Sequence, residues 1–255
     1  MTADRRAALA KLLTALRREG RQIEQADRAL VPETLAEAYA VQADVARRVP
    51  GGTRGWKVGM TSEAAMRARG RTEPVYARLF TATTFYGHGH VPTVLGRRMF
   101  EAEYVFELRR DLPKQDHSRD ALIDAIGAAR PGIEICGSRF STDDSLDLFL
   151  SLADNSFHLG LVIGDPIEDW QDGYLDETVT ITDGDGREGK GSGRDVLGDP
   201  LNALRWLANV DLPDRGLKAG DLVATGVAAK LDVLTPSASA RARFGGRGEI
   251  SADLA

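Results

Sequence analysis

The chain has 255 residues, of which 42% are hydrophobic and 28% charged, and its formal net charge is -5 at pH 7. A chain of this length buries a sizeable core without disulfide or metal crosslinks, and its mild negative charge, without a long basic run, argues against nucleic acid as a partner. Its longest apolar runs are far shorter than the roughly 20 residues that a membrane helix requires.

The first 50 residues predict two helices. In residues 5–18 four leucines recur at helical spacing, and Gly20 follows as a stop signal. Pro32, a residue that the first helical turn tolerates, precedes a second helical pattern in residues 33–49. The N-terminus has no uninterrupted apolar stretch of the kind found in signal peptides, so we expect no targeting segment there.

After residue 52 the pattern changes to short apolar runs separated by Gly and Pro, which predicts strands. In chain order the runs are GWKVGM (55–60), RLFTATTFY (78–86), MFEAEYVFEL (99–108), GIEICGSRF (132–140) and LGLVIG (159–164). They indicate a mostly β body that follows the helical start.

A hairpin and a further helix are expected in the C-terminal part. In residues 177–193 the alternating TVTIT precedes DGDG, which supplies residues that accept positive φ. Asp199 and Pro200 predict the N-cap and first residue of a helix that ends at residue 209, and the rest predicts closing strands. The sequence therefore predicts an α+β fold, with an N-terminal helical segment (1–52) packed on a mostly β body (53–255).

The segment RRMFEAEYVFELRRDL (97–112) predicts a strand with one apolar and one acidic face. Glu101, Glu103 and Glu107 share the acidic face, and neighbouring carboxylates repel one another unless they lie in water, share a proton or hold a cation. Solvation on an edge strand is the simplest explanation. A metal site needs another carboxylate, and Glu134, between two isoleucines, is a candidate because burying it unpaired is costly. Such oxygen ligands suit Mg²⁺, Mn²⁺ or Ca²⁺ rather than zinc.

Three other side chains are candidates for chemistry. Lys57 lies in an apolar strand, where it either reaches solvent or is retained to donate to an oxyanion or relay a proton. His158 follows a polar cluster that leads into an apolar strand, which favours an acid or base role. Cys136, the single cysteine, is expected to be a small core residue. Since one cysteine cannot form an intrachain disulfide, we expect a cytoplasmic protein.

Seven segments along the chain carry a family resemblance: GWKVGMTS, FEAEYVFELRRDL, GIEICGSRF, ADNSFHLGLVIGD, DVLGDPLNALRWLAN, GLKAGDLVATG and FGGRGEI. In this order they resemble the 2-keto-4-pentenoate hydratase and 4-oxalocrotonate decarboxylase branch of the fumarylacetoacetate hydrolase superfamily, from about residue 30 onward. The resemblance implies a fumarylacetoacetate-hydrolase-like β-roll as the catalytic domain. It also implies that Glu101, Glu103 and Glu134 hold Mg²⁺ or Mn²⁺, that Lys57 is catalytic, and that Glu107 lies outside the ligand set.

Four segments depart from the family pattern. Val75 stands where the family has an aspartate, Gly137 replaces the aspartate of a D-S-R motif, and Val227 replaces the serine of T-G-S. In ADNSFHLG, Phe157 and His158 replace small polar residues. We expect these changes to alter the group distal to the 2-oxo acid and to add His158 as a proton carrier. The substrate contacts that the resemblance implies are Arg139, Asn155, Ser156, Phe157, Thr225 and Val227.

The resemblance implies a metal-dependent lyase. The leading hypothesis is a hydratase that converts a 2-hydroxy-2,4-dienoate from aromatic degradation into a 4-hydroxy-2-oxo acid, with water added at C4. The alternatives are a 4-oxalocrotonate-type decarboxylase or a carbon-carbon hydrolase on the same site, and a structural partner subunit that has lost turnover. We expect a homo-oligomer and, as a further partner, a related decarboxylase or hydratase.

Overall fold

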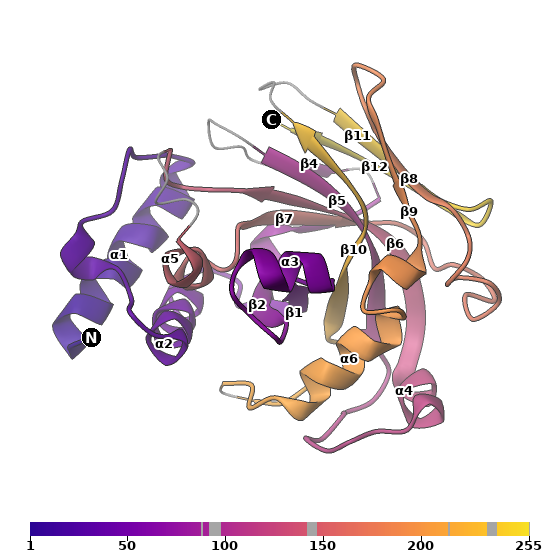
Figure 1. Cartoon of the computed structure of the whole chain (residues 1–255), viewed down its shortest axis with the longest axis horizontal. Coiled ribbons are helices and arrows are strands. Elements are labelled where there is room, and N and C mark those ends of the chain that lie inside the picture. The colour runs from indigo at the N-terminus through magenta and orange to yellow at the C-terminus, as the bar shows by residue number, and fades with distance from the viewer. Residues whose placement is uncertain (88, 92–97, 142–146, 214, 234–238, 255) are drawn as a thin grey trace.

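Two β-sheets and a group of helices make up the computed structural model, which describes residues 1–87, 89–91, 98–141, 147–213, 215–233 and 239–254 (Figure 1). The larger sheet runs in the spatial order β2 (Val75–Phe80), β1 (Thr53–Gly59), β10 (Leu222–Val233), β5 (Arg98–Leu108), β6 (Ile126–Gly137), β7 (His158–Ile163) and β3 (Thr84–Tyr86). The smaller sheet runs in the order β4 (Gly89–Val91), β12 (Gly248–Leu254), β11 (Ser239–Phe244), β8 (Val179–Asp183) and β9 (Glu188–Gly191). The predicted α+β arrangement, a helical start followed by a mostly β body, is confirmed.

The apolar face of β5 forms the centre of the core between the two sheets. Phe100, Tyr104 and Phe106 are fully buried there, together with residues of β8, β11 and β12. The Tyr104 ring stands edge-on to the Phe244 ring of the other sheet, with 5.0 Å between the ring centroids. Burying each such ring contributes roughly 1.5–3 kcal/mol. The predicted alternation of this strand thereby fixes which face its glutamates occupy.

The opposite face of the larger sheet is also buried, because the sheet curls until its β2 edge meets the turn before β7. Leu79, Val105 and Leu161 pack together on this inner face. At the meeting point the Asn155 side chain accepts from Arg78 N at 2.9 Å and donates to Arg78 O at 2.8 Å, as a neighbouring strand would. The acidic face of β5 therefore points into the protein and not into solvent.

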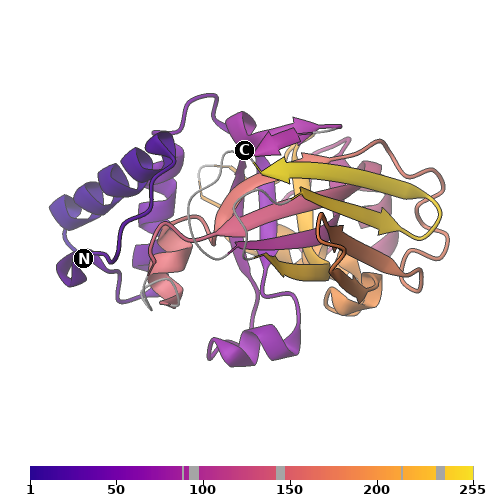
Figure 2. The same cartoon turned by 90° about the horizontal axis from the view of Figure 1, so that it is seen from above.

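Three helices pack together at one end of the sheets, as both views show (Figures 1 and 2). They are α1 (Ala3–Glu19), α2 (Leu35–Ala46) and α5 (Leu148–Ala153), and their apolar side chains form one buried cluster. Both N-terminal helices were predicted. The boundary at residue 52 stays a prediction, because α5 belongs to the later part of the chain but shares the core of this helical group.

The helix ends follow their capping residues. Gly20 ends α1 with a left-handed φ of 58°, a conformation that glycine adopts without steric penalty. The helix α2 begins after Thr34, whose hydroxyl accepts from Glu37 N, so Pro32 lies before the cap and not in the first turn as expected. The predicted late helix is α6 (Pro200–Asn209), with Asp199 as its cap.

The predicted hairpin is also present, as β8 and β9 pair antiparallel across the DGDG turn. Three short helices, α3 (Glu63–Ala68), α4 (Arg119–Ala125) and α5, were not predicted, since six or seven residues are too few to show an apolar period. Among the described residues, no helix is both long and apolar enough to cross a membrane.

Candidate functional site

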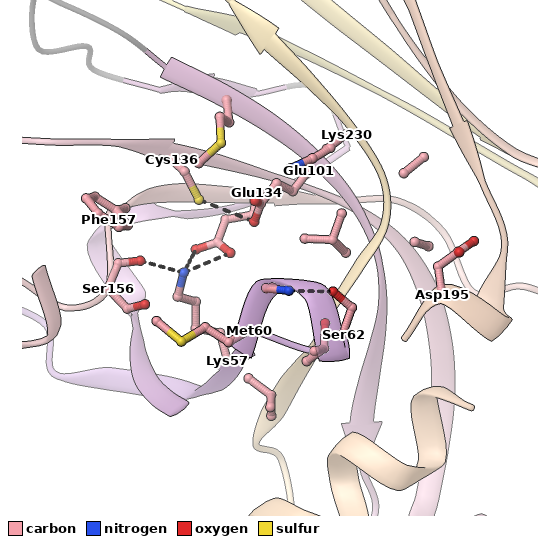
Figure 3. Close-up of a pocket in the computed structure, with 18 of the residues that line it drawn as sticks. Lys57, Met60, Ser62, Glu101, Glu134, Cys136, Ser156, Phe157, Asp195 and Lys230 are labelled. Carbon is pink, nitrogen blue, oxygen red and sulfur yellow. Dashed lines mark hydrogen bonds and ion pairs between the residues drawn. The ribbon is translucent and has the colours of Figure 1, made fainter. Parts of the chain in front are cut away.

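A cavity of about 710 Å³ opens beside α3 (Figure 3). The C-terminal ends of β1 and β6, the N-terminal end of β5, and the strands β9 and β10 contribute further lining residues. Six of the eleven predicted site residues line it: Lys57, Glu101, Glu134, Ser156, Phe157 and Val227. The other five, Glu103, Arg139, Asn155, His158 and Thr225, are described and buried but lie behind the lining. The structure thus gathers metal-binding and substrate-binding candidates around one space.

Lys57 reaches the cavity from β1, where its neighbours Trp56 and Val58 point to the opposite, apolar side. The ammonium Nζ lies 2.9 Å and 3.1 Å from the two carboxylate oxygens of Glu134 and donates to the Ser156 carbonyl at 2.7 Å. Burial by itself would lower the pKa of Lys57, but Glu134, Cys136 and Glu101 together outweigh it and leave the pKa above its usual value. Lys57 is therefore a cation held in place, not a free base.

Glu101 and Glu134 face each other directly across the β5–β6 pairing. Burial and the charge of Glu134 raise the pKa of Glu101, and burial, Glu134 and Glu101 together raise that of Glu103 well above its usual value. For Glu134, burial acts in the raising direction, but Lys57 and His158 outweigh it and lower the pKa to about 2. Negative charge is thereby concentrated on Glu134, beside two carboxyl groups that burial favours in the protonated form.

Glu103 is held by the backbone of β10. Its Oε2 accepts from Gly226 N at 2.8 Å. Gly226 has a φ of 101°, and a Cβ at this position would lie 2.2 Å from Thr61 Oγ1, so the N–H reaches Glu103 only because the residue is glycine. The glycine of the Thr225–Gly226 pair is therefore required for the backbone contact with Glu103 on β5.

The donor atoms fit a divalent cation. Oxygens of Glu101 and Glu134 and the sulfur of Cys136 lie within 4.8 Å of one another. A cation would replace the protons that burial otherwise favours on these carboxyl groups, and carboxylate oxygens are the ligands that Mg²⁺ and Mn²⁺ prefer. Glu103, the third predicted ligand, is adjacent but outside this group of atoms. Cys136 is buried, as expected of a small core residue, but it also lines the cavity, where its thiol donates to Glu101 Oε2 at 3.5 Å.

The turn from Asp154 to His158 supplies two contacts to these residues. Its Ser156 carbonyl binds Lys57, and its Phe157 ring lies at the cavity wall (Figure 3). The His158 Nδ1 lies 2.7 Å from Glu134 Oε1. Burial lowers the pKa of His158, with Glu134 acting in the opposite direction, so the neutral ring donates its Nδ1 proton to the carboxylate. His158 therefore contacts Glu134 from behind the cavity lining.

The remaining predicted contacts have partners within the protein. Arg139 Nη1 lies 3.0 Å from both oxygens of Asp154, and the Thr225 hydroxyl donates to the Tyr104 carbonyl at 2.8 Å. Asn155 closes the sheet edge as described above. Direct substrate contact by these three residues stays a prediction, since each is buried behind the lining. Glu107, at the far end of β5, pairs with Arg130 and lies outside the cavity.

Several lining residues were missed by the sequence reasoning, among them Met60, Arg69, Cys136, Asp195 and Lys230. Lys230 lies directly opposite Glu101 in the β10–β5 pairing, but that register contains two shifts, which a single sequence does not reveal. For Cys136 a signal existed, because residues two apart on a strand share a face and Glu134 is two residues before it.

Comparison with known proteins identifies the family. No protein-family profile matches the chain. It is 33% identical to 2-keto-4-pentenoate hydratase 1 of Dechloromonas aromatica (strain RCB), over 96% of this chain and 95% of the relative.

Among solved structures, 4-oxalocrotonate decarboxylase from Pseudomonas putida G7, complexed with magnesium and adipate, is similar with a TM-score of 0.87 and 27% identity over 100% of this chain and 99% of the other. Fumarylpyruvate hydrolase from Pseudomonas aeruginosa, in complex with Mn²⁺ and pyruvate, shares the fold at 14% identity and a TM-score of 0.59, over 81% and 92% of the two chains. The predicted fumarylacetoacetate-hydrolase-like body is confirmed. The chain belongs to the 2-keto-4-pentenoate hydratase and 4-oxalocrotonate decarboxylase branch of the fumarylacetoacetate hydrolase superfamily.

Proposed function

We propose that this protein is a divalent-metal-dependent hydratase that converts a 2-hydroxy-2,4-dienoate into a 4-hydroxy-2-oxo acid during the breakdown of aromatic compounds. The observation that carries the proposal is the common cavity wall formed by the Lys57 ammonium and the Glu101 and Glu134 carboxylates. The 33% identity to a 2-keto-4-pentenoate hydratase over nearly the whole chain supports the same substrate class.

The proposed ligands are Glu101, Glu103 and Glu134, which would hold Mg²⁺ or Mn²⁺. When bound, the cation supplies positive charge that stabilises an enolate oxygen. Lys57, fixed by Glu134 and the Ser156 carbonyl, would direct a proton of its ammonium to the same oxygen or to the substrate carboxylate. Because its pKa lies above the usual value, Lys57 acts as a donor and electrostatic anchor.

The substrate changes are balanced by one water. Loss of the C2 hydroxyl proton and protonation at C5 give a 2-oxo-3-enoate, whose C3–C4 double bond is conjugated with the carbonyl. Water adds at C4, and C3 gains a proton. His158, through its Nδ1–H, is proposed to hold the ionised Glu134 carboxylate in place beside Lys57.

The proposed substrate contacts fall into two groups. Ser156, Phe157 and Val227 line the cavity, where the latter two give an apolar surface for the distal carbons. Asn155, Arg139 and Thr225 are proposed to act on the substrate through the wall that they hold in place, namely the turn before β7 and the strand β10.

A second candidate function is decarboxylation of a 4-oxalocrotonate-type 2-oxo acid. The observation that favours it is the TM-score of 0.87 over the full chain to a decarboxylase complexed with magnesium and adipate. When CO₂ departs, the electron pair of the broken bond stays on the substrate as an enolate, whose negative charge the Lys57 ammonium in the same cavity wall would stabilise.

The deciding experiment follows the ultraviolet absorbance of freshly generated 2-hydroxypenta-2,4-dienoate and of 4-oxalocrotonate, each with Mg²⁺ and with Mn²⁺. The products are identified by NMR. We expect loss of the dienoate with formation of 4-hydroxy-2-oxopentanoate, and release of CO₂ from 4-oxalocrotonate would favour the second candidate. Consumption of neither substrate under either metal would contradict both.

Assembly and location are part of the proposal. We expect a homo-oligomer in the cytoplasm, able to associate with a related decarboxylase or hydratase. The cytoplasmic location rests on the sequence, whose single cysteine is a buried free thiol. Sedimentation analysis of the purified protein, alone and mixed with such a relative, tests the assembly, and cell fractionation tests the location.

A further inference from the structure

The turn at residues 154–158 has a backbone that its own residue types disfavour. Asn155, Ser156 and Phe157 have φ values of 62°, 51° and 65°, and none of them is glycine. The left-handed conformation costs on the order of 1–2 kcal/mol for such a residue, and Asn tolerates it best of the three. Contacts from the surroundings must therefore hold this turn in place.

The same turn orients both members of the Lys57–Glu134 pair. The Ser156 carbonyl accepts from Lys57 Nζ at 2.7 Å, and His158 Nδ1 lies 2.7 Å from Glu134 Oε1. A displacement of the turn would shift the ammonium and the carboxylate together. Whatever fixes the turn thus fixes the geometry of the cavity wall.

Arg17 of α1 holds the far end of this turn. Its Nη1 donates to the His158 carbonyl at 3.2 Å, and its Nη2 lies 3.7 Å from Asp154 Oδ1. Its guanidinium carbon stands 4.9 Å from the centroid of the Phe80 ring, within the range of a cation–π contact. The Arg17 side chain is 9% exposed, whereas that of the next residue, Arg18, is 77% exposed.

The buried charge of Arg17 indicates a role beyond filling space. Burial and the neighbouring Arg139 lower the pKa of Arg17 to about 9, against the effect of Asp154, so the guanidinium remains protonated at neutral pH. Desolvating a cation is unfavourable, and an apolar side chain of similar volume would pack here without that penalty. The distinct property of Arg17 is its ability to donate to the turn from the helix side.

We propose that Arg17 is a positioning residue for the Lys57–Glu134 pair and acts on it through the turn at residues 154–158. The kinetic part of this inference rests on the proposed hydratase function. Under this proposal α1 contributes to the geometry of the active centre, although no residue of α1 lines the cavity.

The experiment compares Arg17→Met and Arg17→Lys with Arg18→Met, a matched control one residue along the same helix. A misplacement of about 1 Å can lower turnover by about 100-fold, so we expect Arg17→Met to lower kcat by about 10- to 100-fold. KM should change less than about threefold, because Arg17 does not touch the substrate cavity. Arg17→Lys should recover part of kcat, since lysine keeps the charge but not the planar fork, and Arg18→Met should match the wild type.

A second readout does not depend on turnover. The imidazole ¹⁵N resonances of His158, assigned with His158→Gln, should move in Arg17→Met and stay in place in Arg18→Met. Folded Arg17→Met protein with a kcat within twofold of wild type, or with unmoved His158 resonances, overturns the proposal. If Arg17→Met does not fold, an unchanged kcat in Arg17→Lys overturns it instead. If the wild type consumes no dienoate, the proposed function fails, and the His158 resonances alone decide the role of Arg17.

Discussion

Lys57 and Glu134 form a buried ion pair inside the curled sheet, although β10 and β5 separate their strands in the sheet order. The side chains are 5% and 1% exposed. Removing one member of such a pair leaves an uncompensated buried charge, which is more damaging than the absence of both. The pair therefore affects both the stability of the fold and the proposed chemistry.

Replacing Lys57 with Met should separate these two effects. We expect kcat to fall by about 100- to 1000-fold, because one preorganised donor to a developing oxyanion is removed. Affinity for Mn²⁺, measured by electron paramagnetic resonance, should change far less. Lys218→Met is the control, since Lys218 pairs with Asp111 on the surface. Equal losses of kcat and metal affinity would point to a structural role for Lys57.

Substitution of the carboxylates of β5 tests the proposed metal site. Glu101→Gln and Glu103→Gln should each abolish Mn²⁺ binding and turnover, whereas Glu107→Gln, on the same strand but outside the cavity, should leave both intact. For the wild type, a cation at 100 times its Kd should raise the free energy of unfolding by about 2.7 kcal/mol. Chelation should reverse the rise. Full turnover in both Gln variants would refute the ligand assignment.

Asn155 gives a prediction about stability. Asn155→Ala leaves the N–H and C=O of Arg78 without their side-chain partner, and each unpaired buried group costs about 1–3 kcal/mol. We expect the free energy of unfolding in urea to fall by about 2–4 kcal/mol. The control is Asn202→Ala, because the side-chain amide of Asn202 donates to the Leu197 carbonyl at the exposed surface. A loss below about 1 kcal/mol for Asn155→Ala would mean that this contact does not hold the sheet edge.

The tyrosines predict the response to alkaline pH. Burial raises the pKa of Tyr39 to about 12, and burial likewise raises those of Tyr76, Tyr104 and Tyr174. A raised folded-state pKa contributes stability that is complete below the unfolded value of about 10 and is lost as pH rises through the folded value. The free energy of unfolding should therefore decline above pH 10.

Absorbance at 295 nm measures this directly. In native protein at pH 10.5 the tyrosinate signal should be well below that of the same chain in urea, which has five tyrosines. In Tyr39→Phe, one tyrosine fewer should ionise at high pH. Equal tyrosinate absorbance in native and unfolded protein at pH 10.5 would contradict the expectation.

The sequence predicted the alternation of β5 but not what its acidic face meets. Solvent was the simplest reading of Glu101 and Glu103 from that strand alone, because the curl of the sheet depends on contacts far apart in the chain. One of them joins Asn155 to Arg78, 77 residues away. The family resemblance implied the proposed metal site without this geometry.

The turn at residues 154–158 marks the other limit of sequence reasoning. ADNSFHLG suggested substrate contacts and a proton carrier, and Phe157 and Ser156 do line the cavity. That His158 contacts Glu134 and that Arg17 contacts the His158 carbonyl could not be inferred, since both need three consecutive left-handed residues that local propensity disfavours.

The direct register between Glu101 and Glu134 also limits how this chain can vary in length. One residue inserted into or deleted from β5 or β6 would turn the side chains beyond it to the opposite face, moving a carboxylate into the aromatic core between the sheets. Length differences among active relatives should therefore fall in the connections, and any that fall within these two strands should be accompanied by a bulge that restores the phase.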